Sequence, residues 1–66
     1  MLIGYFEPYK GYKGTIEYSL LDECYYGKIV CDSFVNYEAE NVVKLYKEFK
    51  YAVDDYIEFK EDIKNG

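Results

Sequence analysis

The hydrophobic residues of this sequence change their spacing once, near residue 40, and that change limits the folds open to the chain. Before it, apolar and polar residues tend to alternate, as in strands buried on one face. After it, apolar residues recur every three or four positions, as on one side of a helix. A chain of 66 residues has room for one small core. We therefore predict a single α+β domain over residues 1–66, with a small antiparallel sheet packed on one main C-terminal helix (β-β-β-α).

The sheet is predicted to occupy residues 12–37, with three strands, or four if the N-terminal segment joins an edge. Tyr12–Tyr18 places Ile and aromatic residues on one side and polar residues on the other. Ser19–Glu23 then supplies a turn, and Cys24–Cys31 returns antiparallel to the first strand, because so short a link permits only a hairpin. Phe34–Tyr37 follows as a short third strand.

Glycines interrupt the first half of the chain. Residues 1–11 contain Gly4, Gly11 and the only proline, a composition that indicates an irregular or edge segment. Gly14 and Gly27 fall inside predicted strands instead. A glycine within a strand marks close approach by another backbone or an aromatic ring, or else local curvature at a bulge, and the sequence leaves both readings open.

The second half of the chain is predicted to be one long helix over residues 41–63, with Asn41 as its N-cap. Its apolar stripe comprises Val42, Leu45, Tyr46, Phe49, Ala52, Val53, Tyr56, Ile57 and Ile63. The opposite side carries Lys44, Lys47, Tyr51, Asp54, Asp55, Glu58 and Asp62. Acidic residues near a helix C-terminus oppose the macrodipole, so helix stability does not explain them.

The predicted strand 24–31 is apolar on both faces. One face carries Tyr25, Gly27, Ile29 and Cys31, and on the other Cys24, Tyr26 and Val30 leave only Lys28 polar. The helix can cover one face, which leaves the second to the N-terminal segment or to another molecule. We expect Tyr26, and Tyr51 on the polar helix side, to serve association, since interfaces are rich in tyrosine. The tyrosines expected in or beside the core are Tyr18, Tyr25 and Tyr56.

The absence of histidine argues against several kinds of chemistry. Serine or cysteine catalysis needs a base beside the nucleophile, and a structural zinc site needs four Cys or His ligands, but the only such residues are Cys24 and Cys31. Seven residues of extended chain separate these cysteines by roughly 23 Å, too far for a disulfide. We predict no metal, no cofactor and no enzymatic activity. Without a signal peptide or a long apolar run, we expect a cytoplasmic protein that does not bind membranes.

Charge favours a protein partner over nucleic acid. Thirteen Asp and Glu residues outnumber eight Lys, there is no arginine, and the net charge is −5. Nucleic-acid binding is therefore disfavoured, and a basic protein partner is favoured. Asp54, Asp55 and Glu58 share a helix face and have the ligand chemistry for Mg²⁺ or acid–base work, but exposed acidic faces more often meet solvent or partners. The predicted partner-binding residues are Tyr26, Lys28, Tyr51, Asp54, Asp55 and Glu58.

Three blocks of sequence resemble the HicB family of type II antitoxins. They are Tyr9–Ser19 (YKGYKGTIEYS), Tyr25–Lys28 (YYGK) and Ala52–Phe59 (AVDDYIEF), and they occur in the family's order. The resemblance implies a partly degraded ribonuclease-H-like arrangement without catalytic residues. HicB proteins neutralise HicA, a small, basic, mRNA-cleaving toxin, by covering its active surface. Leu20–Glu23 departs from the family's acidic, glycine-containing turn.

The resemblance implies an antitoxin that binds a HicA-like toxin through its acidic helix face or an exposed sheet edge, and that forms a homo-dimer or higher oligomer. Most family members continue into a C-terminal DNA-binding domain, whereas the present sequence ends after the predicted helix. We therefore expect no direct operator binding from these residues. The alternative is a solitary HicB-like module that acts as a homo-oligomeric adaptor or regulator and has no toxin partner.

Overall fold

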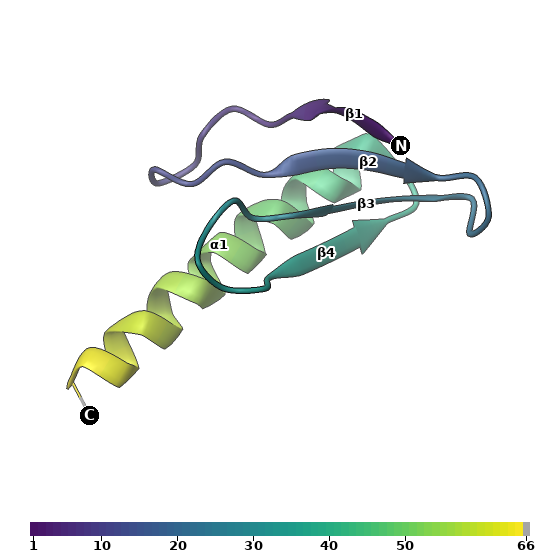
Figure 1. Cartoon of the computed structure of the whole chain (residues 1–66). Helices are drawn as coiled ribbons and strands as arrows, with labels where there is room; N and C mark the ends of the chain where they lie inside the picture. Colours follow the sequence, from purple (N-terminus) through teal and green to yellow (C-terminus); the bar gives the residue numbers. More distant parts are fainter. Residues whose placement is uncertain (66) are drawn as a thin grey trace.

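The computed structural model describes the backbone of residues 1–65 and the side chains of residues 1–61, and it contains a four-stranded sheet followed by one helix (Figure 1). The α+β prediction, with one C-terminal helix after the strands, is confirmed. The elements are β1 (Leu2–Tyr5), β2 (Thr15–Ser19), β3 (Cys24–Lys28), β4 (Asn36–Ala39) and α1 (Val42–Asn65).

The sheet is an antiparallel meander in the order β1-β2-β3-β4. Gly27 in β3 lies opposite Tyr37 in β4, and the ring of Tyr37 contacts Phe49 of α1 at 5.7 Å between centroids. Because side chains alternate along a strand, the neighbouring pair, Tyr26 and Glu38, faces away from the helix. The helix therefore covers one face of the sheet, here the inner face, and leaves an outer face (Figure 1).

The first predicted strand begins later than expected. Tyr12 is not in β2 but closes a tight turn, in which Tyr9 and Tyr12 exchange two backbone hydrogen bonds of 2.9 and 3.0 Å. The two residues between them, Lys10 and Gly11, have φ of 52° and 85°. Positive φ at both central positions is the geometry of a type I′ hairpin turn, which Gly11 adopts without steric cost.

The other two predicted strands are present, but their bounds differ from the predicted ones. The regular pairing of the second strand ends at Lys28 instead of Cys31, although Ile29 still bridges Gly14. The third strand is Asn36–Ala39 instead of Phe34–Tyr37, and Phe34 lies 94% exposed in the preceding loop. Phe34 is the kind of residue that strands favour, but here it lies in a loop. The prediction relied on composition and therefore started this strand too early. Cys24 and Cys31 are free, as predicted.

The N-terminal segment provides the edge strand β1 and then folds over the helix side of the sheet. Phe6 stacks on Phe49 with 5.3 Å between ring centroids, and Tyr9 meets the same ring edge-on at 6.4 Å. Tyr12 contacts Tyr56 edge-on at 5.5 Å. The segment therefore completes the inner face, and no described part of the chain covers the outer face.

The helix begins where Asn41 predicts and buries the middle of the predicted stripe, whereas Val42 and Tyr46 at its start are exposed. The Asn41 side chain accepts a hydrogen bond of 2.8 Å from the backbone N–H of Lys44, which is the geometry of an N-cap. Leu45, Phe49 and Val53, spaced four residues apart, are fully buried. Tyr56 is also buried, Ala52 and Ile57 pack around this core, and Ile63 lies outside the described side chains.

Gly14 and Gly27 lie where aromatic rings approach the sheet, which confirms one of the two readings of these glycines. A Cβ atom at Gly14 would come within 3.0 Å of Tyr37 and Phe49, and one at Gly27 would collide with the Thr15 carbonyl and the Tyr37 ring. The ring of Tyr37 thereby crosses Gly27, and its hydroxyl donates a 2.8 Å hydrogen bond to the Thr15 carbonyl. Burial raises the pKa of this phenol well above its ordinary value.

We predict that Gly27→Ala lowers the free energy of unfolding by roughly 1–3 kcal/mol, because the added methyl group collides with the Thr15 carbonyl and the Tyr37 ring. Gly4→Ala is the matched control, since a Cβ at Gly4 has no atom within 4 Å. The control should change stability by less than about 0.5 kcal/mol. Urea denaturation followed by circular dichroism measures both. If Gly27→Ala and Gly4→Ala lowered the free energy of unfolding equally, the close packing at Gly27 would not contribute to stability.

Candidate functional site

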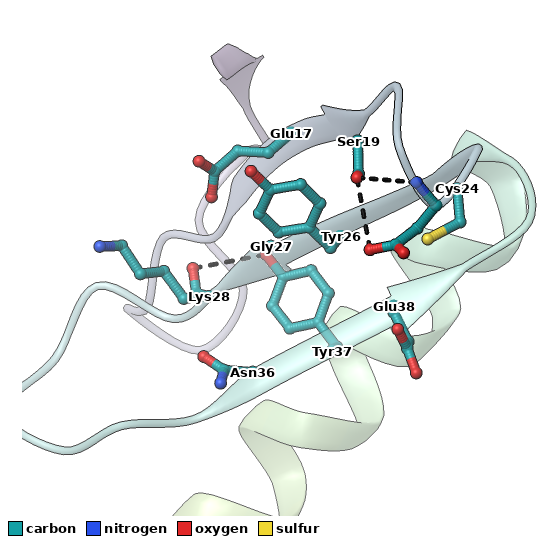
Figure 2. A pocket seen from close by; sticks show the side chains of 10 residues that line it. Glu17, Ser19, Cys24, Tyr26, Gly27, Lys28, Asn36, Tyr37 and Glu38 are labelled. Atoms are coloured by element: carbon teal, nitrogen blue, oxygen red, sulfur yellow. Dashed lines mark hydrogen bonds between the residues drawn. The ribbon is translucent and has the colours of Figure 1, made fainter. Parts of the chain in front are cut away.

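The outer face of the sheet contains a groove with a volume of about 740 Å³ (Figure 2). Strands β2, β3 and β4 form its floor, and the β2–β3 turn closes one end. Its lining side chains are mainly polar: Glu17, Ser19, Asp22, Cys24, Tyr26, Lys28, Asn36 and Glu38. The groove therefore joins two of the predicted partner-binding residues, Tyr26 and Lys28, to acidic residues that the prediction did not include.

A row of three side chains crosses the middle of this face. Glu17 lies directly opposite Tyr26, and Tyr26 lies directly opposite Glu38. The Tyr26 and Glu17 residues are half-buried, and Glu38 is exposed. Figure 2 shows the three side chains projecting from neighbouring strands. We call this set the Glu17–Tyr26–Glu38 row.

Thr15 orients one end of the row. Its hydroxyl donates a 2.9 Å hydrogen bond to Glu17 Oε2 and accepts one of the same length from the Lys28 backbone N–H. Thr15 is itself buried. The buried hydroxyl both donates and accepts a hydrogen bond, so it orients the Glu17 carboxylate while the Glu17 residue remains partly exposed.

The outer side of α1 is the second candidate surface. Tyr51 is 62% exposed, and Asp55 and Glu58 are exposed on the following turns. This surface and the outer face of the sheet belong to opposite layers of the molecule. The predicted set of site residues therefore divides between two separate surfaces.

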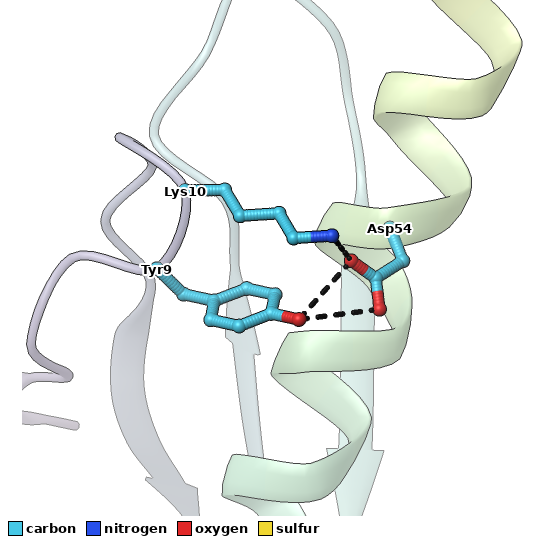
Figure 3. Close-up of polar contacts among 3 residues, drawn as sticks. All are labelled: Tyr9, Lys10 and Asp54. Carbon is cyan, nitrogen blue, oxygen red and sulfur yellow. Dashed lines mark hydrogen bonds and ion pairs between the residues drawn. The ribbon is translucent and has the colours of Figure 1, made fainter.

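Asp54 differs from the other predicted helix residues, because it is engaged within the chain (Figure 3). Its carboxylate accepts hydrogen bonds from Lys10 Nζ at 2.8 Å and from the Tyr9 hydroxyl at 3.2 Å. Both donors belong to the type I′ turn of the N-terminal segment, Tyr9 as its first residue and Lys10 at its first central position. The hydrogen bond from Lys10 holds the pKa of Asp54 below its ordinary value, and the same contact raises the pKa of Lys10. Asp54 thus fastens this turn to the helix.

The described residues assemble neither a metal-binding cluster nor a membrane helix. No three Cys, Asp or Glu side chains among them converge as ligands would. Over the same part of the chain, no helix combines the length and apolarity needed to cross a bilayer. Asp54, Asp55 and Glu58 point in different directions for a physical reason, since the first turns toward Tyr9 and Lys10 and the others face outward.

Glu17 and Glu38 are the site residues that sequence reasoning missed. Their alternation with apolar neighbours indicated a solvent-facing side, but their meeting across β3 depends on strand register. That register follows from the contact between Tyr37 and Gly27, which no local pattern encodes.

No protein-family model, no curated protein and no solved structure matches this chain.

We predict that Asp54→Asn lowers the urea midpoint at neutral pH, because the amide loses the charge that attracts Lys10. The folded-state pKa of Asp54 is depressed, so its stabilisation is present above the ordinary value of 3.8 and is lost as pH falls through the folded pKa. The midpoints of the variant and the original protein should therefore converge in strong acid. Asp55→Asn removes an equal charge from the exposed neighbouring position and serves as the control. If the difference between the urea midpoints persisted unchanged in acid, the ion pair between Lys10 and Asp54 would not be its cause.

Proposed function

We propose that this chain is a non-enzymatic, cytoplasmic, antitoxin-type binding protein that neutralises a small, basic, HicA-like mRNA-cleaving toxin by covering its active surface. The observation that carries the proposal is the uncovered outer face of the sheet, whose groove is lined by Glu17, Asp22 and Glu38 against a single lysine, Lys28. The resemblance of three sequence blocks to the HicB family supports the same function.

The proposed inhibition follows from competition for charge. A basic protein that cleaves RNA binds the phosphate groups largely through Lys and Arg side chains. A partner that presents carboxylates to those cations takes the place of the phosphates, and opposite net charges accelerate the encounter. The chain has a net charge of −5 and an acidic groove on a sheet face that no described segment covers, so it meets both requirements.

The alternative function is that of a solitary homo-oligomeric module, and the outer edge of β1 favours it. This strand carries no charged residue, and Leu2, Ile3 and Tyr5 are each more than half exposed. Uncharged, apolar edge strands pair readily with further strands, including those of a second copy. A dimer formed at this edge leaves the outer face open, so homo-oligomerisation and toxin binding are compatible.

The test of the proposal is to tag the protein in its native host, purify it gently at low salt and weigh the complexes by native mass spectrometry. We predict a small basic protein in fixed stoichiometry with the chain, released when the salt concentration is raised to about 1 M, because screening weakens the attraction. The separated partner should cleave RNA, and adding back the chain should abolish that cleavage. Recovery of homo-oligomers alone at native expression levels would support the solitary module instead.

The purified chain should show no RNA cleavage of its own in the presence of Mg²⁺. A metal-dependent turnover that Asp54→Asn abolishes would overturn the non-enzymatic proposal.

A further inference from the structure

We propose that the Glu17–Tyr26–Glu38 row is a binding site for an arginine side chain of the basic protein partner. In this arrangement the guanidinium lies on the Tyr26 ring and donates hydrogen bonds to the carboxylates on either side. This proposal rests on the proposed function in one respect, that the partner is a basic protein. It adds the face on which that partner docks and the chemical group that is recognised.

The strand register builds the site. Adjacent strands lie about 4.8 Å apart, so the backbones of Glu17 and Glu38 are roughly 10 Å apart with Tyr26 midway between them. When the partner's arginine is bound, the flexible glutamate side chains would turn toward the ring and close much of this distance. A planar guanidinium has donors along several edges, and it can therefore bond to both carboxylates while it stacks on the aromatic face. A lysine ammonium is a compact point charge, so it cannot stack on the ring and bond to both carboxylates as a planar guanidinium can.

The charges of the row are uncompensated within the described chain. Among the described side chains, the ion pairs are Lys10 with Asp54 and Lys44 with Glu40, and neither includes Glu17 or Glu38. Lys28 lines the same groove but lies opposite Asn36, and its ammonium makes no ion pair with either glutamate. Two carboxylates thus face solvent on one surface, and a cation from a partner is their complement.

Other tyrosine rings of the chain already carry cations. Lysine ammonium groups lie over Tyr9, Tyr46 and Tyr56 at 4.7–5.4 Å from the ring centroids. No described cation occupies Tyr26 in this way, although Glu17 and Glu38 lie beside it on the two neighbouring strands. The surroundings of Tyr26 therefore favour a cation more than those of the other three rings, although no described cation of the chain lies on it.

The outer side of α1 offers a weaker complement to a basic partner. Lys44, Lys47 and Lys50 lie on the first half of the helix, and Lys60 lies beyond Glu58, so positive charges are interspersed there. Asp54 is already paired with Lys10. The observations therefore favour the sheet face over the helix face, and binding to the helix becomes an outcome of the test.

The test is an NMR titration of the ¹⁵N-labelled full chain with the probe peptide acetyl-Gly-Arg-Gly-amide at low salt. We predict saturable amide shifts centred on Glu17, Tyr26 and Glu38. The double variant Glu17→Gln/Glu38→Gln should weaken the apparent affinity at least fivefold. The matched control Asp55→Asn/Glu58→Gln removes the same total charge from the helix and should change the affinity less than twofold.

Further variants separate recognition from folding. Glutamine retains the acceptor that the Thr15 hydroxyl uses, so the double variant should keep a folded amide spectrum. Tyr26→Leu should weaken peptide binding through loss of the aromatic ring, whereas Tyr51→Asp should not weaken it. Lys28→Ala should strengthen binding, because it removes a like charge beside the row. A lysine version of the peptide should bind more weakly than the arginine version.

The contradicting results are distinct for the two proposals. Peptide shifts centred on Asp55 and Glu58, equal weakening by both double variants, or no saturable shift would overturn the arginine site. A basic protein that co-purifies and still binds the Glu17→Gln/Glu38→Gln variant unchanged would also overturn it, and would leave the proposed function intact. Recovery of homo-oligomers alone would count against the proposed function, while the peptide titration would still decide the site.

Discussion

The packing of Tyr37 and Phe49 against glycines is the interaction on which the rest of this structure depends. Because Gly14 and Gly27 have no side chain, the two rings lie directly on the sheet, and Tyr37 can reach across β3 to the Thr15 carbonyl. That hydrogen bond and the ring contact fix the register of three strands. They also bring the helix close to the sheet, so that Tyr37 and Phe49 pack with the aliphatic residues Ile29, Leu45 and Val53 in one core.

This packing gathers most of the aromatic contacts on the helix side of the sheet. Phe6 and Tyr9 fold over to the same ring of Phe49, and Asp54 fastens the turn that follows them. The N-terminal segment is therefore committed to the inner face. The outer face keeps its polar residues and the ring of Tyr26, and the register set beneath it aligns two carboxylates with that ring. The core thus determines the geometry of the surface that we propose for binding.

The sequence predicted what depends on local periodicity and failed where distant residues decide. The fold class, the Asn41 cap and the stripe through Phe49 follow from spacing, and all three are confirmed. The start of β4 was placed too early because exposed Phe34 resembles a strand residue by composition. The engagement of Asp54 and the alignment of Glu17 with Glu38 were missed, since these contacts join residues whose proximity depends on the turn geometry and the strand register. Tyr26 was selected correctly as an outward-facing residue, and its role in association stays a prediction.

The central claim is that the outer face of the sheet, rather than the helix, meets the basic partner. Carboxyl footprinting of the chain alone and in its purified complex tests this claim most directly, because a carbodiimide-coupled amine labels each accessible Asp and Glu separately. The account predicts that labelling of Glu17 and Glu38 falls sharply in the complex while Asp55 and Glu58 stay reactive. Protection of Asp55 and Glu58, with Glu17 and Glu38 still labelled, would contradict it.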